Sequence, residues 1–280
     1  MKLSLSTGTL YVYPLRMVFR RARMAGFDGV ELVVNPEAIV RGGLAVRRLA
    51  DAEGVEIFSV HPTVVPLPGW RERHGGMDRT IRLAQEAGAR LVVMHTPRSA
   101  SLDKGEGLAF RRTVEAWRRR LAGSNLRLAI ENKDIRAEAH RRYALSPLNQ
   151  LRAFADRHDL GLVLLFLIFS FSGEDLMYAR QTFGERLIDV HLSDMRGWLS
   201  PLPLSSLRRA LGQHLFPATG DLPLADLLSA LSGDGYAGPV TLEVNPIAIR
   251  IWWPPTVRRR LAQAVKWMRR VTGAEAPSGE

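Results

Sequence analysis

Regular alternation is the feature that most constrains the fold of this chain. Eight short runs, either apolar or alternating between apolar and polar residues, recur about every 30 residues and are separated by longer amphipathic stretches. The runs predict strands at Lys2–Thr7, Gly29–Val34, Ile57–Pro62, Leu91–Pro97, Arg127–Lys133, Gly161–Phe166, Leu187–Asp194 and Pro239–Val244. The stretches predict helices at Pro14–Ala25, Leu44–Ala52, Arg73–Ala87, Leu108–Leu121, Ser146–Arg157, Glu174–Phe183, Asp221–Leu231 and Pro255–Arg270.

Eight strand–helix units predict an α/β fold, a single closed (β/α)8 barrel. A doubly wound sheet would usually contain fewer strands. We expect the barrel to cover residues 1–272 and residues 273–280 to form a flexible C-terminal tail. Gly26, Gly88 and Gly123 each follow a predicted helix, where a left-handed cap is favoured.

The chain contains no cysteine, which excludes disulfides, thiolate zinc sites and cysteine nucleophiles. Any metal must therefore be bound by oxygen and imidazole ligands. The longest apolar run, Leu160–Phe169, has about ten residues, whereas a membrane-spanning helix needs about 20. The residues after Met1 are too polar for a signal-peptide core. We therefore expect a cytoplasmic protein with no membrane partner.

Basic residues outnumber acidic ones by 39 to 28, a formal net charge of +11, and only four of the 39 are lysines. This charge permits nucleic acid or phosphorylated ligands. The arginine runs, however, fall on predicted helices or their flanks, and in a barrel the helices form the outer ring. The pattern is typical of a solvated surface, so nucleic-acid binding is allowed by the charge but is not favoured.

Polar residues that could support catalysis end the predicted strands. In barrel enzymes the reactive groups lie at the carboxyl ends of the strands, so these side chains are expected to converge. They are Glu31 in the second run, His61 in the third, His95 in the fourth, Glu131-Asn132 in the fifth, His191 and Asp194 in the seventh, and Glu243 and Asn245 in the eighth, with His214 in the loop between the last two.

Several segments resemble the xylose-isomerase-like TIM barrel superfamily, which includes sugar isomerases, sugar epimerases and the endonuclease IV group. The resemblance covers nearly the whole chain, and its most specific parts are the Glu131-Asn132 pair and the last segment. The segments are Gly26–Leu32 (GFDGVEL), Ser59–Pro62 (SVHP), Val93–His95 (VMH), Leu128–Asn132 (LAIEN), Asp189–Asp194 (DVHLSD) and Gly235–Val244 (GYAGPVTLEV).

This resemblance implies that Glu131, His191 and Glu243 bind a divalent metal. Carboxylate and imidazole ligands suit Mn²⁺, Mg²⁺, Co²⁺ or Zn²⁺. It also implies that Glu131 and Glu243 are the catalytic pair, which exchanges protons with the carbon beside a carbonyl. The residues assigned to substrate binding are His61, His95 and His214, which in the endonuclease branch extend the metal site, together with Arg98, Asp194 and Trp198 near the strand ends.

The sequence departs from the superfamily after the sixth run. An aspartate ligand and, three residues later, a histidine are expected there, but Leu165 and Ile168 occupy these positions. No acid or histidine occurs between Asp159 and Glu174, so shifting the alignment restores neither ligand. Because losses even outside the ligand shell cost about 10–100-fold in metal affinity, we expect weak metal binding or none. The gap also argues against a full endonuclease-type metal cluster.

Aromatic residues cluster near the same predicted opening. They can either wall a ligand pocket or form a subunit interface, which would make a homo-oligomer. They are Phe166, Phe169, Phe171, Trp198, Trp252 and Trp253.

Three functions remain open from the sequence. The leading hypothesis is a metal-assisted isomerase or epimerase acting on a small polyhydroxylated substrate, such as a sugar or a sugar phosphate. The second is a barrel that has lost catalysis and serves as a binding or assembly protein. The third is an endonuclease IV-like phosphodiesterase. The fold alone cannot choose a substrate, because one barrel supports many chemistries.

Overall fold

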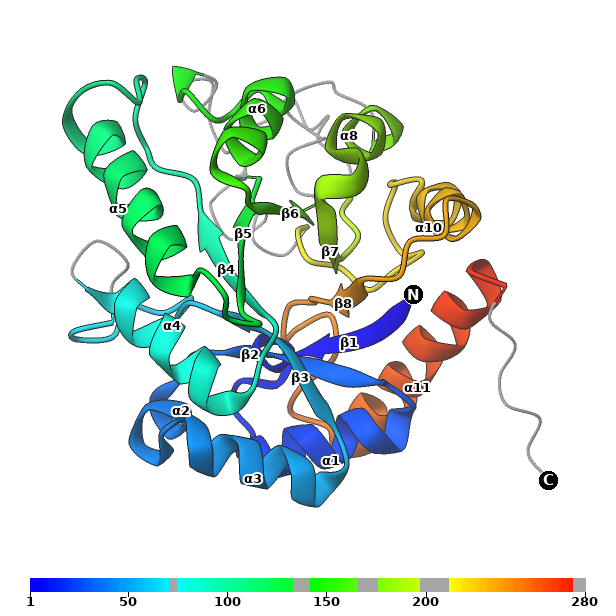
Figure 1. The fold of residues 1–280 in the computed structure, drawn as a ribbon. Helices are drawn as coiled ribbons and strands as arrows, with labels where there is room; N and C mark the ends of the chain where they lie inside the picture. Colours follow the sequence, from blue (N-terminus) through cyan, green and yellow to red (C-terminus); the bar gives the residue numbers. More distant parts are fainter. Residues whose placement is uncertain (71–74, 133–141, 166–175, 197–211, 274–280) are drawn as a thin grey trace.

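A computed structural model describes residues 1–70, 75–132, 142–165, 176–196 and 212–273. It contains eight parallel strands closed into a barrel, each paired with the next and the last paired with the first (Figure 1). The strands are β1 Lys2–Ser6, β2 Gly29–Val33, β3 Glu56–His61, β4 Leu91–His95, β5 Arg127–Glu131, β6 Gly161–Leu165, β7 Leu187–Leu192 and β8 Pro239–Leu242. The predicted (β/α)8 barrel is confirmed, and every predicted strand begins within one residue of an observed strand.

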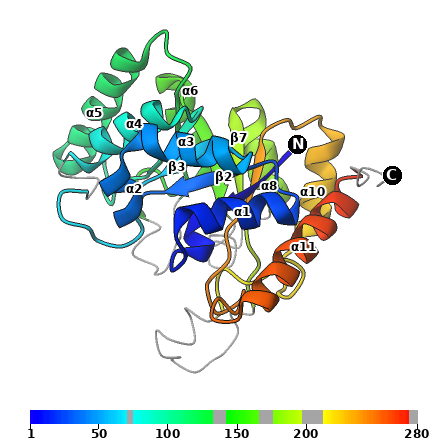
Figure 2. The same cartoon turned by 90° about the horizontal axis from the view of Figure 1, so that it is seen from below.

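Helices form the outer ring around this barrel (Figure 1). They are α1 Leu15–Ala25, α2 Pro36–Arg41, α3 Gly43–Glu53, α4 Gly76–Ala87, α5 Gly105–Leu121, α6 Leu148–His158, α8 Leu176–Phe183, α10 Leu224–Gly233 and α11 Pro254–Val271, with short 3₁₀ helices η1 Thr7–Leu10 and η5 Gly184–Arg186. The helix α2 was not predicted. Asn35 caps it by accepting a hydrogen bond from the Ala38 N–H, and Pro36 occupies its first turn. Helix α1 and helix α11 lie side by side on one flank (Figure 2).

Helix ends follow the predicted glycines with one difference. Gly26 and Gly88 cap α1 and α4 in the left-handed conformation, with φ of 91° and 73°. Helix α5 instead ends with Ala122 as its cap, and Gly123 follows with φ of 80°. The predicted start of the helix at Arg73 and that at Glu174 both lie outside the described residues, as do residues 274–280 of the predicted tail.

The barrel interior is apolar on one side and polar on the other. Val93, Ala129 and Val163, from β4, β5 and β6, form a small buried apolar cluster. The ionisable side chains of the candidate site described below lie nearer the carboxyl ends of the strands, and they include His95 of β4 and Glu131 of β5. None of the helices within the described ranges is long and apolar enough to cross a membrane.

Candidate functional site

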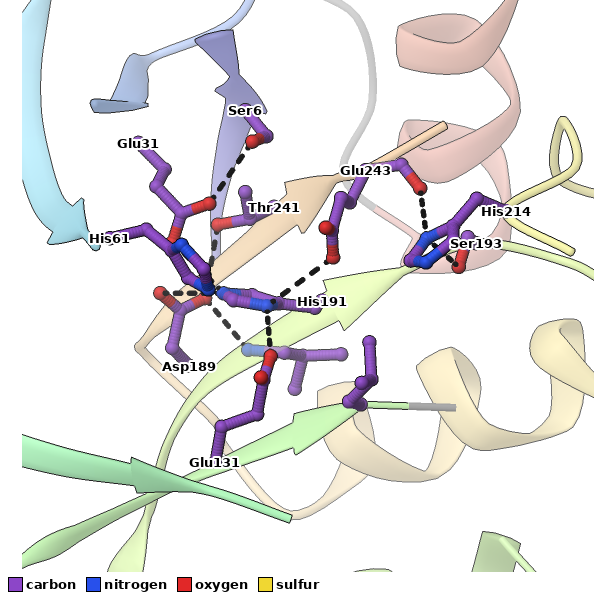
Figure 3. Close-up of polar contacts among 12 residues, drawn as sticks. Ser6, Glu31, His61, Glu131, Asp189, His191, Ser193, His214, Thr241 and Glu243 are labelled. Carbon is purple, nitrogen blue, oxygen red and sulfur yellow. Dashed lines mark hydrogen bonds and ion pairs between the residues drawn. The ribbon is translucent and has the colours of Figure 1, made fainter. Parts of the chain in front are cut away.

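His191 lies at the centre of a group of ionisable side chains inside the barrel (Figure 3). It is fully buried near the end of β7, where alternation along the strand turns it to the same side as Asp189. Its Nδ1 atom lies 2.7 Å from Glu131 Oε1 and 3.5 Å from Glu243 Oε2. Its Nε2 atom lies 3.0 Å from Glu31 Oε2. The imidazole thus separates two carboxylates on one side from a third on the other.

Glu131, His191 and Glu243 together form a group that fits a divalent cation. One ligand atom from each lies within 4.8 Å of the others, and ligands bound at 2.0–2.2 Å are separated by about 3 Å when their bonds are perpendicular. His191 Nδ1 and Glu243 Oε2 are buried, and neither makes a hydrogen bond of acceptable geometry within the described part of the chain. Buried polar atoms are rarely left so, and a cation bound by both would satisfy them.

A second layer of polar residues lies on the Nε2 side of His191. Glu31 accepts hydrogen bonds from Ser6 Oγ at 3.1 Å and from Ser59 Oγ at 3.3 Å. Asp189 Oδ1 accepts from Thr241 Oγ1 at 3.0 Å, while Asp189 Oδ2 lies 3.9 Å from His191 Nε2. Carboxylates on this side favour the proton on Nε2 when the imidazole is neutral, which leaves the Nδ1 lone pair directed toward Glu131 and Glu243.

Burial and the charged neighbours act in opposite directions on the pKa values of this group. Burial alone would raise the pKa of Glu131, but His191 and His95 hold this pKa well below its usual value. Burial likewise acts to lower the pKa of His191, and Glu31 and Glu131 more than reverse it. Asp189 behaves differently, because burial dominates and raises its pKa to about 7. In the metal-free protein the imidazole is therefore the cation that balances the surrounding carboxylates.

His61 and His95 join the group through Glu131. His95 Nε2 lies 3.2 Å from Glu131 Oε2, and the His61 and His95 rings pack edge to face at 4.9 Å. His61 Nδ1 lies 2.7 Å from the Pro62 carbonyl, so it is the nitrogen that donates, and Nε2 remains able to accept a proton or bind a ligand. Potential ligand atoms of His61, His95 and Glu131 also lie within 4.8 Å of one another.

The other predicted substrate-binding residues occupy different surroundings. His214 is half-buried, with Nδ1 3.3 Å from the Glu243 carbonyl oxygen and 3.4 Å from Ser193 Oγ. Arg98 is exposed after β4, and Trp198 lies outside the described residues. Of the substrate-binding predictions within the described ranges, the structure brings together His61 and His95, and it places His214 beside the Glu243 backbone.

Asp194 is tied to the protein backbone. Its carboxylate accepts hydrogen bonds from the amides of Met195 and Gly220, both at 2.8 Å, and from that of Leu222 at 3.2 Å. A Cβ on Gly220 would lie 2.4 Å from Asp194 Oδ1, so the turn there depends on glycine. The geometry assigns the fully buried Asp194 to holding the loop after β7, and its substrate-binding role stays a prediction.

The predicted gap in the ligand set lies at the end of β6. Leu165 is paired in register with His191, and its side chain packs against Met195 and Leu222. The Asn132 side chain holds this strand end: Asn132 Nδ2 donates to the Leu165 carbonyl at 2.8 Å, and the Leu165 N–H donates to Asn132 Oδ1 at 2.6 Å. The position next to His191 is therefore apolar. Ile168, Phe166, Phe169 and Phe171 lie outside the described residues.

Sequence reasoning did not assign a role to Glu31 or Asp189. The available signal is period-two alternation, which turns residues 189 and 191 of β7 to one side and makes an acid at position 189 a neighbour of His191. The signal for Glu31 is weaker, because a register irregularity between Val30 and Glu31 shifts its pairing with β3.

Comparison with known proteins agrees with this architecture. The family model described as xylose isomerase-like TIM barrel matches residues 19–271. An uncharacterized protein of Mycobacterium bovis is 29% identical over 272 residues, which cover 89% of this chain and 90% of the relative. A 3-dehydroshikimate dehydratase of Pseudomonas aeruginosa is 30% identical over 227 residues, 79% of this chain but only 34% of that protein.

Solved structures show the same fold at lower identity. The 3-keto-D-glucoside 4-epimerase of E. coli has a TM-score of 0.70 and 18% identity, with 96% of this chain and 99% of that chain covered. D-Psicose 3-epimerase of Clostridium cellulolyticum has a TM-score of 0.69 and 15% identity, with 99% and 100% covered. From the family model and the closed eight-stranded barrel together, the chain belongs to the xylose isomerase-like TIM barrel family.

Proposed function

We propose that the protein is a divalent-metal-assisted isomerase or epimerase that acts on a small polyhydroxylated substrate. One observation carries the proposal: potential ligand atoms of Glu131, His191 and Glu243 lie within 4.8 Å of one another, and the buried His191 Nδ1 and Glu243 Oε2 atoms make no hydrogen bond of acceptable geometry in the described ranges. In the metal-free protein these two atoms have only ion-pair contacts, His191 Nδ1 with Glu131 and Glu243. A cation held by the three residues would bind both atoms.

Glu131, His191 and Glu243 would hold the metal, which supplies polarisation of a substrate carbonyl. Two carboxylates around a dication give a neutral site, whereas the three expected in the superfamily would give a net charge of −1. Leu165 contributes no oxygen at the remaining position. We therefore expect affinity below that of a site with a complete ligand set, and a protein that needs added metal for full activity.

The two glutamates would move the proton. Glu131 is buried and held ionised by His191 and His95, while the Glu243 side chain is about a quarter exposed. One carboxylate removes a proton from the carbon beside the carbonyl and the other returns a proton. His95 contacts Glu131 and has a side chain that is about one-third exposed, so it can pass protons between Glu131 and the solvent.

Relatives support a sugar-like substrate. The similar folds named above include a 3-keto-D-glucoside 4-epimerase and a D-psicose 3-epimerase whose structure was determined with D-tagatose. Carbonyl and hydroxyl oxygens on adjacent carbons could occupy open metal positions, and the apolar patch at Leu165, Met195 and Leu222 could contact a sugar face. A phosphorylated sugar remains compatible with the exposed Arg98 near the site.

Dehydration is a second candidate. The dehydratase relative is 30% identical over most of this chain, although this chain spans only a third of that protein. Loss of water from a carbon next to an enolising centre begins with the same proton removal and then expels a hydroxyl group. Product analysis distinguishes the two, because an epimerase conserves mass and a dehydratase loses one water.

The test is deuterium exchange. The protein is incubated with D-tagatose or 3-dehydroshikimate in D₂O, with Mn²⁺ or with EDTA, and incorporation beside the carbonyl is followed by NMR. We expect metal-dependent incorporation that falls by about 10²–10⁴-fold in Glu243→Gln, the range for loss of a general base. Glu56→Gln, which removes an exposed carboxylate from the start of β3, is the matched control and should retain full exchange.

Metal binding is measured separately by calorimetry with Mn²⁺. Binding that is lost in His191→Asn and retained in the Glu56→Gln control is the expected result. A protein that binds no Mn²⁺ at millimolar concentration would contradict the proposal and favour a binding or assembly role. Mn²⁺ binding without exchange on either substrate would reject those substrates while leaving the metal site intact.

A further inference from the structure

Helices α1 and α11 form a surface with no acidic residue. They pack side by side on the outer ring (Figures 1 and 2). Helix α1 contains four arginines, and α11 contains five arginines and one lysine, so the two helices together carry ten cations and no carboxylate. We call these two helices, with the Arg250–Trp253 segment that leads into α11, the α1–α11 face.

Most of these cations have no acidic partner among the residues that the structure describes. Arg16 and Arg20 both pair with Glu53 of α3. None of the cations of α11 forms an ion pair within the described ranges, although Arg269 donates to the Gly26 carbonyl. Partial burial and the neighbouring Arg250 and Arg259 lower the pKa of Arg260, as expected where like charges are crowded. A surface of this kind has an attractive potential for a polyanion.

The surface between the two helices is hollowed. One hollow of about 230 Å³ is lined by Met17, Arg20, Arg21, Met24, Ala25 and Arg258. A second, of about 560 Å³, is lined by Arg21, Pro254, Pro255, Arg258, Arg259 and Ala262. Arg21 and Arg258 line both, so the two hollows are neighbours, and we call them together the groove. Its arginines place several cations within reach of one linear anionic chain.

Two exposed aromatic residues directly precede Pro254 and Pro255, which line this groove. Trp252 and Trp253 directly precede α11 and are 63% and 60% exposed. Tyr13, at the start of α1, donates to the Ile251 carbonyl at 2.7 Å and packs under Arg21, which connects the tryptophan segment to the groove. Exposed indole rings beside unpaired guanidinium groups match the requirements of unpaired bases, which stack on aromatic faces while their phosphates meet arginine.

We propose that the α1–α11 face binds single-stranded nucleic acid. The phosphates lie along Arg21, Arg258 and Arg259, and bases stack on Trp252 or Trp253. The groove lies on the outer ring, whereas Trp252 and Trp253 lie in the connection from β8 to α11, and the proposed binding uses none of the residues assigned to the metal or to catalysis. A second copy of the chain is disfavoured as the occupant, because a two-fold interface would oppose one acid-free face to another.

The experiment measures anisotropy of a fluorescein-labelled oligothymidylate of about 20 nucleotides, longer than a single-strand site of roughly 4–16. EDTA is present so that metal-dependent binding in the barrel does not contribute. The double variant Arg258→Gln/Arg259→Gln should bind at least 10-fold more weakly at low salt. Because each phosphate contact adds about 0.7 to the slope of log affinity against log salt, losing two should reduce that slope by about 1.4.

The matched control is Arg112→Gln/Arg119→Gln. Both residues are exposed on α5, across the barrel from α11, so this variant loses the same net charge (Figure 1). Its affinity for the oligonucleotide should stay within about 2-fold of that of the parent protein, a change that the lower net charge alone accounts for. Equal losses in the two double variants would overturn the proposal, because binding would then reflect overall charge rather than this face.

The aromatic part is tested with Trp252→Ala and Trp253→Ala. Stacking predicts a loss of about 5-fold or more in at least one variant, and weaker competition by a duplex of the same length. If both tryptophan variants bind the oligonucleotide as tightly as the parent protein, the proposal that bases stack on Trp252 or Trp253 is wrong. Binding to phosphatidylserine vesicles but not to the oligonucleotide would overturn the proposal in favour of a membrane. Self-association that is lost in the tryptophan variants would overturn it in favour of a second copy.

Discussion

The barrel interior and the α5–α6–η5 sector of the outer ring use the same kinds of charged residue in opposite ways. On the outside, Arg152 and Arg186 contact Asp156, and Arg186 also contacts Asp159. These arginines and acids form an outer network, completed by the pairs Arg118–Asp159 and Arg152–Glu185. Each charge there has a partner and is partly open to solvent.

The inner cluster consists of Glu31, His61, His95, Glu131, Asp189, His191 and Glu243. Here several buried polar atoms of His191, Asp189 and Glu243 lack a hydrogen bond within the described part of the chain. Solvent screens the outer network, whereas burial makes each missing partner in the cluster costly. The comparison shows that the number of charges alone does not distinguish the two regions, whereas burial with incomplete hydrogen bonding does, and this is why we propose the functional site at the inner cluster.

The largest effect is expected from His191→Leu. The change leaves Glu31, Glu131 and Asp189 buried around an apolar side chain, and removal of one partner from a buried charge group costs about 3–5 kcal/mol. Urea unfolding followed by circular dichroism, in EDTA, measures the free energy of unfolding. A loss below about 1 kcal/mol would be typical of an exposed ion pair, and it would contradict the conclusion that charges in the inner cluster are more costly to disturb than those in the outer network.

Asn132→Ala tests a neutral part of the interior. It removes both hydrogen bonds to the Leu165 backbone and leaves a buried N–H and a buried carbonyl without them. We expect a loss of about 2–6 kcal/mol in the free energy of unfolding, at about 1–3 kcal/mol for each of the two groups. Asn132→Asp keeps one acceptor and serves as the companion variant. If the alanine variant is as stable as the parent, the end of β6 is held by other contacts.

The strand positions were predictable because apolar and alternating runs reflect burial directly. Convergence of Glu131, His191 and Glu243 was also predictable, since parallel strands bring their carboxyl ends to one opening. The partners of His191 could not be predicted, because they depend on the register between neighbouring strands. Irregularities at Val30/Glu31 and Leu162/Val163 shift that register. Nor does the sequence reveal that Asp194 turns its carboxylate to backbone amides.

The outer surface shows the same limit. The arginine runs at 111–112, 118–120, 258–260 and 269–270 lie on helices as predicted, whereas Arg141 of the run at 141–142 lies outside the described residues. The sequence does not show which helices are neighbours, so the contrast between the paired network and the acid-free α1–α11 face emerges only when α1 packs against α11. Helix α2 was not predicted, although Asn35-Pro36 is a common start of a helix. The helix has only six residues, which is too short for a helical period of apolar residues to be recognised.

In the metal-free protein, the free energy of unfolding should depend on pH in opposite directions in the two regions: the inner cluster loses stability as the pH rises, and the outer network loses it as the pH falls. Burial raises the pKa of Asp189 to about 7, so its contribution to stability is full below its unfolded pKa of about 4 and is lost as the pH rises through about 7. The raised pKa of His191 acts in the same direction above about 6.5. We expect Asp189 alone to lower the free energy of unfolding by about 2 kcal/mol between pH 5.5 and 8.5, and His191 to add to this loss above about pH 6.5.

Asp189→Asn is the control for this dependence and should reduce it to the part that His191 contributes, whatever its effect on absolute stability. Mn²⁺ should oppose the loss, because its ligands bind when deprotonated. A metal-free protein whose stability rises between pH 5.5 and 8.5 would contradict the assignment of a protonated group beside His191.

The smallest effect is expected in the outer network. Arg186→Gln removes the contacts to Asp156 and Asp159, whose side chains are 45% and 63% exposed, so screening limits the loss to about 0–1 kcal/mol near neutral pH. Contacts with arginine lower the pKa of both aspartates, and burial opposes this effect. The stabilisation from these contacts is therefore present above about pH 4 and is lost as the pH falls through the lowered pKa values.

The free energy of unfolding of the variant, measured in urea, should therefore be lower than that of the parent protein at pH 7 and equal to it at acid pH. Added salt should make the difference at pH 7 smaller. A loss at pH 7 that matches His191→Leu, or that salt leaves unchanged, would show that these exposed pairs carry as much free energy as the buried cluster.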